Sequence, residues 1–455
     1  MHQFRLYDAT ADKVVAVESI GPIDAAILGR LAIPHPSAAG DSQPRAQSVY
    51  VCGITPYDTT HLGHAFTYAV ADHLIRLLEL LGQRVHYVQN VTDIDDDILR
   101  KAGEVGQDWR SLGNRWTRHF IQDMQRLNIR PPDHYPRASA YIPQMVQAIE
   151  TLLQRGLAYV AQGSVYYDAI AWPKFGQISR LDADELLPTA NEHGNLPEDP
   201  HKRHPLDFPL WQAQQPDEPA WESPWGPGRP GWHIECSSMA AALLGNTVDF
   251  HGGGSDLAFP HHECEIAQSE PVSGAQPFVR HWFHAAMVEY EGEKMSKSLG
   301  NLIMARDLLE EVSPDALRLY LADHHYRQPW SYSRHDLQNK ANQVAQWSLA
   351  VTTAGGKGTE FDFAPQQVVA VMDAYLNDLD TPSAIHSLDG LAQELLAAAQ
   401  AGREVSAARR TFIRLAGVLG LRLVSAMPEA PVVAGWNRHL HEFNGAQTAD
   451  AAHPA

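Results

Sequence analysis

The clearest hydrophobic pattern in the chain lies between residues 47 and 91, where strand and helix signals alternate. The segment SVYVCGI, from Ser48, is a continuous apolar run of the kind that forms a buried strand. It is followed by FTYAVADHLIRLLELLG, which carries apolar residues at helical spacing and ends at Gly82, and then by the strand-like run RVHYVQNV. Strand, helix and strand in this order predict a βαβ unit, and so a parallel sheet with a right-handed crossover.

The rest of the chain divides into further segments. Residues 109–156 are helical apart from a break at RPPDHYPRAS, SVYYDAIAW is strand-like, and 182–230, rich in Pro, Glu, Asp and Trp, predict a loop-dominated insertion. VDFHGGGSDLAF and HHECEIAQSE repeat the order strand then helix, and beyond residue 313 the pattern is almost wholly helical. We therefore expect an α/β fold in three parts: an N-terminal strand and loop extension over 1–46, a parallel-sheet domain over 47–333 interrupted by a connecting lobe at 130–225, and a C-terminal helix bundle and tail over 334–455.

Composition and charge narrow the function classes. A length of 455 residues suits two or three domains. The 35 Lys and Arg against 54 Asp and Glu give a net charge of −19, which argues against broad, charge-driven binding of nucleic acid or anionic membrane. The 3 cysteines are too few for a disulfide framework, and we find neither a signal peptide nor an apolar run of about 18 residues. We expect a cytoplasmic protein that does not span a membrane.

Two short motifs suit phosphate chemistry. HLGH, from His61 to His64, stands between the first strand and the helix, where two imidazoles and a helix N-terminus can meet the phosphates of a nucleotide. KMSKS, with Lys294 and Lys297, offers two ammonium groups that can neutralise charge on a triphosphate as its α-phosphate is attacked. Alone, the first can be an ordinary strand-to-helix turn and the second a solvated turn. Together, in this order, they resemble the two-part signature of class I aminoacyl-tRNA synthetases, which implies a Rossmann-type catalytic domain and a catalytic role for these four side chains.

Four further residues have the chemistry of a zinc site. Cys52 ends the first strand, Cys236 lies in GWHIEC, and His261 and Glu265 are four apart in PHHECE, hence on one helix face. Each has an alternative, because a lone buried cysteine is usually a small core residue and PHH can cap a helix without binding anything. We assign Cys264 to the core.

The sequence around these residues, from about 47 to 335, resembles that of cysteine-activating class I enzymes. It includes YVCGITPYDTTHLGHA, YVQNVTDIDDDI, GRPGWHIECSSM, FHGGGSDLAFPHHECEIAQSE and GEKMSKSLGN. The resemblance implies ATP as substrate with Mg²⁺, and one Zn²⁺ per chain that holds the substrate thiolate on Cys52, Cys236 and His261, with Glu265 as a fourth ligand or an outer group. It also implies that the adenylate and its cysteine are bound by Cys52, Gly53, Ile54, Thr55, Thr67, Asn90, Val91, Thr92, Trp232, Gly254, Ser255, Asp256 and Val288.

Two families share such a site: cysteinyl-tRNA synthetases, and the cysteine ligases of mycothiol biosynthesis, which use the amine of glucosaminyl-inositol as acceptor. The sequence CGITPYDTTHLGHA resembles the corresponding motif of the ligases, and so does DLDTPSAIHSLDGLA in the bundle. EHGNLP, from Glu192, stands where the ligases carry their acceptor-side ERGGDP motif. The chain also lacks the GIxLxD…GTxW ending by which tRNA enzymes are recognised. In contrast, EIAQSE and KMSKSLGN resemble the corresponding sequences of the tRNA enzymes.

On balance we expect a monomer that joins L-cysteine to glucosaminyl-inositol at the expense of ATP. Charging of tRNA-Cys is the alternative, and tRNA is a partner only under it. A related ligase with another amine acceptor is a third possibility. A binding or regulatory paralogue is disfavoured because HLGH and KMSKS keep both histidines and both lysines.

Overall fold

A computed structural model describes residues 2–23, 45–58, 60–216, 218–295, 300–424 and 430–450. Its centre is a four-stranded sheet in the order β12-β11-β5-β6 in which every neighbouring pair is parallel. The strands are β5 (Gln47–Ile54), β6 (Val85–Val91), β11 (Val248–Gly254) and β12 (Val279–Ala285). Strands β5 and β11 are buried along almost their whole length, as an apolar run in a sheet covered on both faces requires. The expected Rossmann-type α/β fold is therefore confirmed.

Helix α2 (Leu62–Leu80) makes the crossover between β5 and β6. It begins where the side chain of His61 accepts a hydrogen bond from the backbone N–H of His64, and it ends before Gly82, whose φ of 79° continues no helix. Most of its side chains are buried, so the helix lies between layers rather than on the surface.

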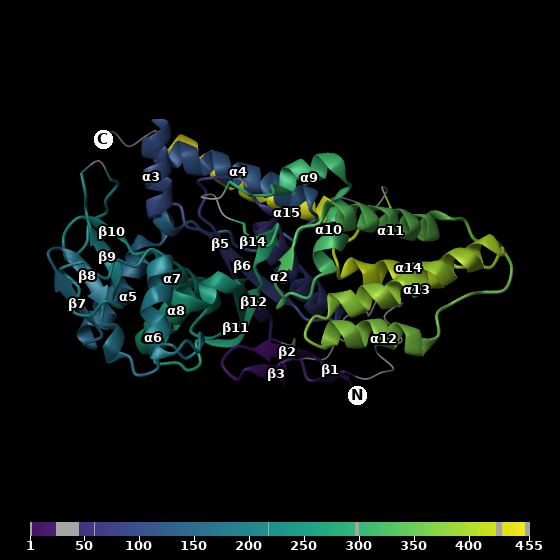
Figure 1. The fold of residues 1–455 in the computed structure, drawn as a ribbon, viewed down its shortest axis with the longest axis horizontal. Helices are drawn as coiled ribbons and strands as arrows, with labels where there is room; N and C mark the ends of the chain where they lie inside the picture. The colour runs from purple at the N-terminus through teal and green to yellow at the C-terminus, as the bar shows by residue number, and fades with distance from the viewer. Residues whose placement is uncertain are drawn as a thin grey trace.

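The connecting lobe is more regular than its sequence suggests. Its antiparallel sheet has the order β10-β9-β8-β7 and lies beside helices α5, α7 (Trp232–Leu244) and α8 (Glu263–Ser273) (Figure 1). Within 182–230, α6 begins at a reciprocal cap of Asp182 and Glu185 in spite of Pro188, while most of this stretch lies outside helices and strands. The elements from α3 to β10 are α3 (Asp96–Val105), α4 (Trp109–Arg126), α5 (Ile142–Gln154), β7 (Ala158–Ala161), β8 (Ser164–Tyr167), α6 (Ala183–Glu192), β9 (Phe208–Ala213) and β10 (Gly228–Pro230).

The N-terminal extension forms short strands beside the central sheet. Strands β2 and β3 pair as a hairpin, β1 pairs with β4, and β2 contacts β12. Most of the expected surface excursion, PHPSAAGDSQPRAQ, lies outside the described residues. The four strands are β1 (His2–Gln3), β2 (Arg5–Asp8), β3 (Lys13–Ala16) and β4 (Pro22–Ile23).

The second half of the chain returns to the sheet and then becomes helical. The structured elements are α7 (Trp232–Leu244), α8 (Glu263–Ser273), β13 (Val288–Tyr290), β14 (Glu293–Lys294), α9 (Ala305–Glu311), α10 (Pro314–Ala322), β15 (Trp330–Ser331), α11 (Arg334–Thr352), α12 (Pro365–Leu376), α13 (Thr381–Gln400), α14 (Ser406–Gly417) and α15 (Ala430–Asp450).

Helix α15 was not expected from the sequence. It leaves the bundle of α11 to α14 and runs back along α4 (Figure 1). Trp436 anchors it, since its indole is fully buried and donates to the carbonyl oxygen of Ile129 at 2.9 Å. The segment read as a tail is therefore, over 430–450, a packed helix.

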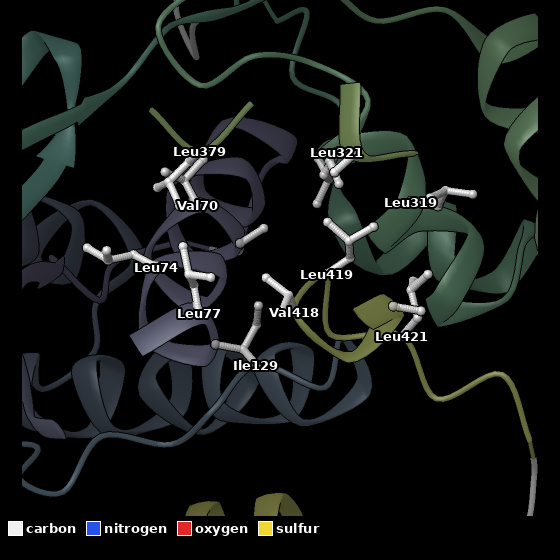
Figure 2. Close-up of a cluster of buried hydrophobic side chains, with 14 of the residues drawn as sticks. Val70, Leu74, Leu77, Ile129, Leu319, Leu321, Leu379, Val418, Leu419 and Leu421 are labelled. Carbon is white, nitrogen blue, oxygen red and sulfur yellow. The ribbon is translucent and has the colours of Figure 1, made fainter. Parts of the chain in front are cut away.

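One apolar core joins the central sheet to the bundle. Leu74 and Leu77 of α2, Leu319 of α10 and Leu419 after α14 all belong to the same buried cluster (Figure 2). At about 25 cal/mol per Å² of buried apolar surface, such a junction resists separation of the two parts. Among the described residues, no helix is long and apolar enough to cross a membrane.

Candidate active site and metal centre

The carboxyl ends of β5, β6 and β11 open into one cavity of about 880 Å³. Ligands of open α/β sheets bind at this edge. Most of the residues expected to bind substrate line it: Cys52, Gly53, Ile54, Thr55, His61, His64, Thr67, Asn90, Thr92, Trp232, Cys236, Gly254, Asp256, His261 and Val288. Three do not: Val91 is buried in β6, Ser255 starts a short helical turn, and Glu265 lies behind the cavity wall.

The HLGH histidines stand together at the start of α2. The rings of His61 and His64 stack with centroids 3.7 Å apart. A Cβ on Gly63 would lie 3.1 Å from the His61 ring, which explains a glycine between them. The backbone of this segment is also held from outside, because Leu62 N–H donates to Ile303 O at 2.8 Å and Ala305 N–H donates to Thr60 O at 3.0 Å.

The KMSKS lysines are only partly described. Lys294 belongs to β14, but the structure describes its backbone alone, and Lys297 lies outside the described residues. The segment 303–305, shortly after this loop, is the one that pairs with 60–62. The chain therefore brings the flanks of the two motifs side by side.

Cys52, Cys236, His261 and Glu265 meet at the floor of the cavity, which the first three line. One potential ligand atom from each lies within 4.8 Å of the others, and all four side chains are buried. Cys52 Sγ is 4.0 Å from Cys236 Sγ and 3.7 Å from Glu265 Oε1, and His261 Nε2 is 3.1 Å from Glu265 Oε1. Neither cysteine forms a disulfide.

This set fits a divalent zinc ion by its donors and its electrostatics. His261 Nε2 is buried inside the set, 3.1 Å from Glu265 Oε1, where it can serve as a ligand atom. Burial opposes ionisation of Cys236, but its hydrogen bond with Cys52 and the charge of His261 outweigh burial and hold the pKa of Cys236 well below the ordinary value. Burial likewise opposes the charge of His261, yet Cys236 raises the pKa of His261 to about 10. A thiolate beside a proton-binding imidazole is the site at which a metal cation can replace a proton.

A second layer of histidines surrounds Cys52 and was missed in the sequence. His251 Nε2 and His262 Nε2 lie 3.5 and 3.4 Å from Cys52 Sγ, and His262 Nδ1 is 2.8 Å from His284 Nε2. A second potential ligand set consists of Cys52, His251, His262 and Glu265, and it shares Cys52 and Glu265 with the first. The only signal for them was their place beside the glycine run and in PHH, which does not reveal that three separate segments converge.

The amino-acid side of the cavity is held by short polar contacts. Gly53 N–H donates to Asn90 Oδ1 at 2.7 Å, and a Cβ on Gly53 would lie 1.5 Å from the Asn90 carbonyl oxygen, so no other residue fits there. Thr55 and Thr92 share a hydroxyl hydrogen bond of 2.8 Å. The Trp232 ring lies 4.2 Å from the His261 ring, which places an aromatic wall against the metal set.

The opposite wall belongs to the connecting lobe. Lys202 Nζ donates to Asn195 Oδ1 at 2.5 Å, and Tyr166 OH donates to Asp199 Oδ2 at 2.7 Å, and all four residues line the cavity. Of the EHGNLP stretch, His193 to Leu196 line it, whereas Glu192 does not.

An acidic strip, Asp95 to Asp97, lines the cavity at the start of α3. Burial raises the pKa of Asp95 to about 6. Arg229 of β10 pairs with Asp96 and, at 3.0 Å, with Glu218, so the lobe is tied to this strip across the cavity. Two of the three carboxylates of the strip are therefore paired with arginines, since Asp97 also pairs with Arg100 at 2.6 Å.

Comparisons with solved structures agree on the fold. A Mycobacterium tuberculosis methionyl-tRNA synthetase bound by methionyl-adenylate matches with a TM-score of 0.59 and 16% identity, over 88% of this chain and 93% of that one. An enzyme described as a putative arginyl-tRNA synthetase from Campylobacter jejuni matches with a TM-score of 0.52 and 14% identity, over 89% of this chain and 100% of that one. These similarities concern the fold alone.

Sequence comparisons are more specific. Residues 40–342 match the family model described as tRNA synthetases class I (C) catalytic domain. An L-cysteine:1D-myo-inositol 2-amino-2-deoxy-alpha-D-glucopyranoside ligase from Parafrankia sp. is 46% identical over 355 residues, 78% of this chain and 79% of that protein. The ligase of the same name from Thermomonospora curvata is 44% identical over 371 residues, 80% of this chain and 88% of that protein. The chain therefore belongs to the class I tRNA synthetase (C) catalytic domain family and, within it, to the cysteine ligases of this name.

Proposed function

We propose that this protein activates L-cysteine with ATP as cysteinyl-adenylate and transfers the cysteinyl group to the amine of glucosaminyl-inositol. The observation that carries the proposal is the buried set of Cys52, Cys236, His261 and Glu265, of which all but Glu265 line the same cavity as the HLGH histidines. The identity of the acceptor is proposed from the names of the ligases that are 44–46% identical to this chain.

Selection of cysteine is assigned to the metal set. A zinc ion bound there would supply a Lewis-acidic position that a thiolate fills well and a serine hydroxyl fills poorly. Cys52, Cys236 and His261 would hold it, with Glu265 as a fourth ligand or as an outer group. Trp232 closes the apolar side of the amino-acid pocket, and Asp256, which lines the cavity, faces the substrate ammonium.

The first step is attack of the cysteine carboxylate on the α-phosphate of ATP, with release of pyrophosphate. His61 and His64, stacked at the positive end of α2, donate to the phosphates and stabilise the charge that builds up. Lys294 and Lys297 supply further positive charge, and Mg²⁺ accompanies the leaving phosphates. Thr67, Gly254 and Val288, which line the cavity, are assigned to the adenylate, with Asn90 and Thr92 beside it.

In the second step the acceptor amine attacks the cysteinyl carbonyl and AMP leaves. The lobe wall offers Lys202, Asn195, Asp199 and Tyr166, which are donors and acceptors suited to the hydroxyls of an amino sugar. The names of the relatives favour the sugar over tRNA-Cys.

A single-turnover transfer assay tests the proposal. Cysteinyl-adenylate is formed on the enzyme, the sample is divided, and one half receives glucosaminyl-inositol and the other tRNA-Cys, while AMP and the cysteinylated product are followed. We expect product with the sugar alone. Charging of tRNA without sugar product would replace the proposal with the tRNA enzyme, and failure to form adenylate would remove both.

We further propose that the enzyme is a cytoplasmic monomer whose connecting lobe, near 130–225, carries acceptor recognition. Light scattering at micromolar concentration tests the oligomeric state, for which a mass of 50.4 kDa is expected. Lys202→Ala tests the role of the lobe in acceptor binding. It should raise the KM for the sugar and leave adenylate formation unchanged.

A further inference from the structure

His233 contacts the metal set from outside it. It is the second residue of α7, and its Nδ1 lies 2.9 Å from Nδ1 of His261. The other nitrogen of His261, Nε2, lies 3.1 Å from Glu265 Oε1 within the ligand set. The two nitrogens of His261 therefore face in different directions, one toward His233 and one into the ligand set.

We propose that His233 is a positioning residue that fixes the tautomer and ring orientation of His261 for metal binding. A histidine that ligates through Nε2 must carry its proton on Nδ1, and that proton needs an acceptor. His233 Nδ1 is the atom within hydrogen-bond distance of it. His233 thus accepts from His261 and leaves Nε2 free as the ligand atom.

The packing of both rings supports this role. The Trp232 ring lies 4.2 Å from the His261 ring, which limits its rotation. The His233 ring is in turn held edge-on by Phe208 of β9, with centroids 5.5 Å apart at 81°. The lobe sheet therefore restrains the ring of His233, and His233 in turn orients His261. A sheet that contributes none of the four potential ligands thus influences the orientation of one of them.

The decisive variants separate the acceptor atom from the ring. His233→Phe keeps a ring against Phe208 and removes the acceptor, whereas His233→Asn places an amide oxygen near the position of Nδ1. The control is His439→Ala, which removes a buried histidine from α15, where it contacts Pro132 O at 2.8 Å, far from the metal set in the sequence and on another element. Full-length proteins are purified without added metal and loaded with Zn²⁺.

The readout is zinc affinity by competition with a chromophoric chelator, together with the absorption spectrum of the Co²⁺-substituted protein. We expect His233→Phe to weaken zinc binding by roughly 10- to 100-fold, as is typical for an outer-sphere partner of a ligating histidine. His233→Asn should recover most of the affinity and the parental Co²⁺ spectrum, and His439→Ala should leave both unchanged.

The outcomes distinguish this inference from the proposed function on which it rests. If the parental protein binds no zinc, the metal assignment itself fails. If it binds zinc and His233→Phe binds it equally well, only the role of His233 is overturned. Should His233→Phe fail to fold, His233→Asn is compared with His233→Gln, whose longer amide reaches the position of Nε2 instead; equal affinities for these two would also overturn the proposal.

Discussion

Arg318 and Asp72 meet inside the junction between the catalytic sheet and the helix bundle. Arg318 Nη2 donates to Asp72 Oδ2 at 2.6 Å, and neither side chain is exposed. Arg318 also donates through Nε to Leu419 O at 2.8 Å, while Arg76 and the backbone N–H of Arg130 donate to the same carboxylate. Because Asp72 lies on α2, the helix that presents HLGH is fixed to α10 and to the end of α14 by one buried network.

Loss of Arg318 should be strongly destabilising. Arg318→Ala leaves Asp72 buried with one guanidinium fewer, and breaking a buried pair in this way costs about 3–5 kcal/mol. The control is Arg334→Ala, because Arg334 is exposed and pairs with Glu311 on the surface, where a pair contributes about 0–1 kcal/mol. Urea unfolding at equilibrium measures both. An Arg318→Ala cost no greater than that of Arg334→Ala would mean that the network contributes little to joining the two parts.

His73, the neighbour of Asp72, should make the fold sensitive to acid. Burial, with a contribution from the charge of Arg318, lowers the pKa of His73 to about 3. An unfolded histidine titrates at about 6.5, so between these two values the unfolded state binds a proton that the folded state does not. Stability therefore falls as the pH falls through this window, by up to about 1.4 kcal/mol per pH unit from this residue. His73→Gln should show a shallower dependence of unfolding free energy on pH from 6.5 to 4.5, and an unchanged slope would contradict the assignment.

The local pattern of apolar residues was enough to predict the central sheet and α2. It was not enough to predict α15 or the histidines around Cys52. Strands β5 and β11 and helix α2 are buried on nearly all sides, so their apolar residues are continuous or periodic in the sequence. Helix α15 is fixed by Trp436 contacting the distant carbonyl of Ile129, a relationship that no sequence window contains. Cys52, Cys236, His261 and Glu265 were identified by resemblance, whereas His233 and His251 became visible only when separate segments were brought together.

The pair of Arg306 and Asp123 should affect adenylate formation. Arg306, on α9, donates from Nη2 to both carboxylate oxygens of Asp123 on α4, at 3.0 and 3.2 Å. It directly follows the strip 303–305 that pairs with 60–62, so the ion pair fixes the strip that sets the position of His61.

A small displacement of a phosphate-binding group is costly in rate. We expect Arg306→Ala to lower kcat of cysteine-dependent ATP–pyrophosphate exchange by roughly 10- to 100-fold, with the KM for cysteine unchanged. Glu310→Gln is the matched control, because Glu310 lies on the same helix and its pair with Arg126 is largely exposed. Active-site titration corrects for misfolded enzyme. An undiminished kcat per active site would show that the pair has no part in positioning the histidines.

The two buried cysteines Cys236 and Cys264 should respond to substitution by serine in opposite ways. Cys236 Sγ lies 4.0 Å from Cys52 Sγ within the ligand set, whereas Cys264, although buried, belongs to neither potential ligand set. Because loss of an outer-sphere partner already weakens a metal site by 10–100-fold, loss of the Cys236 thiolate should lower zinc affinity by at least about 100-fold and abolish cysteine-dependent exchange with it. Cys264→Ser buries a hydroxyl at a cost of about 1–3 kcal/mol in stability, yet it should keep one zinc per chain and full exchange at a temperature where it is folded. Elemental analysis of both proteins, alongside exchange rates, decides the matter: stoichiometric zinc in Cys236→Ser, or its loss in Cys264→Ser, would move the metal away from the four residues assigned to it.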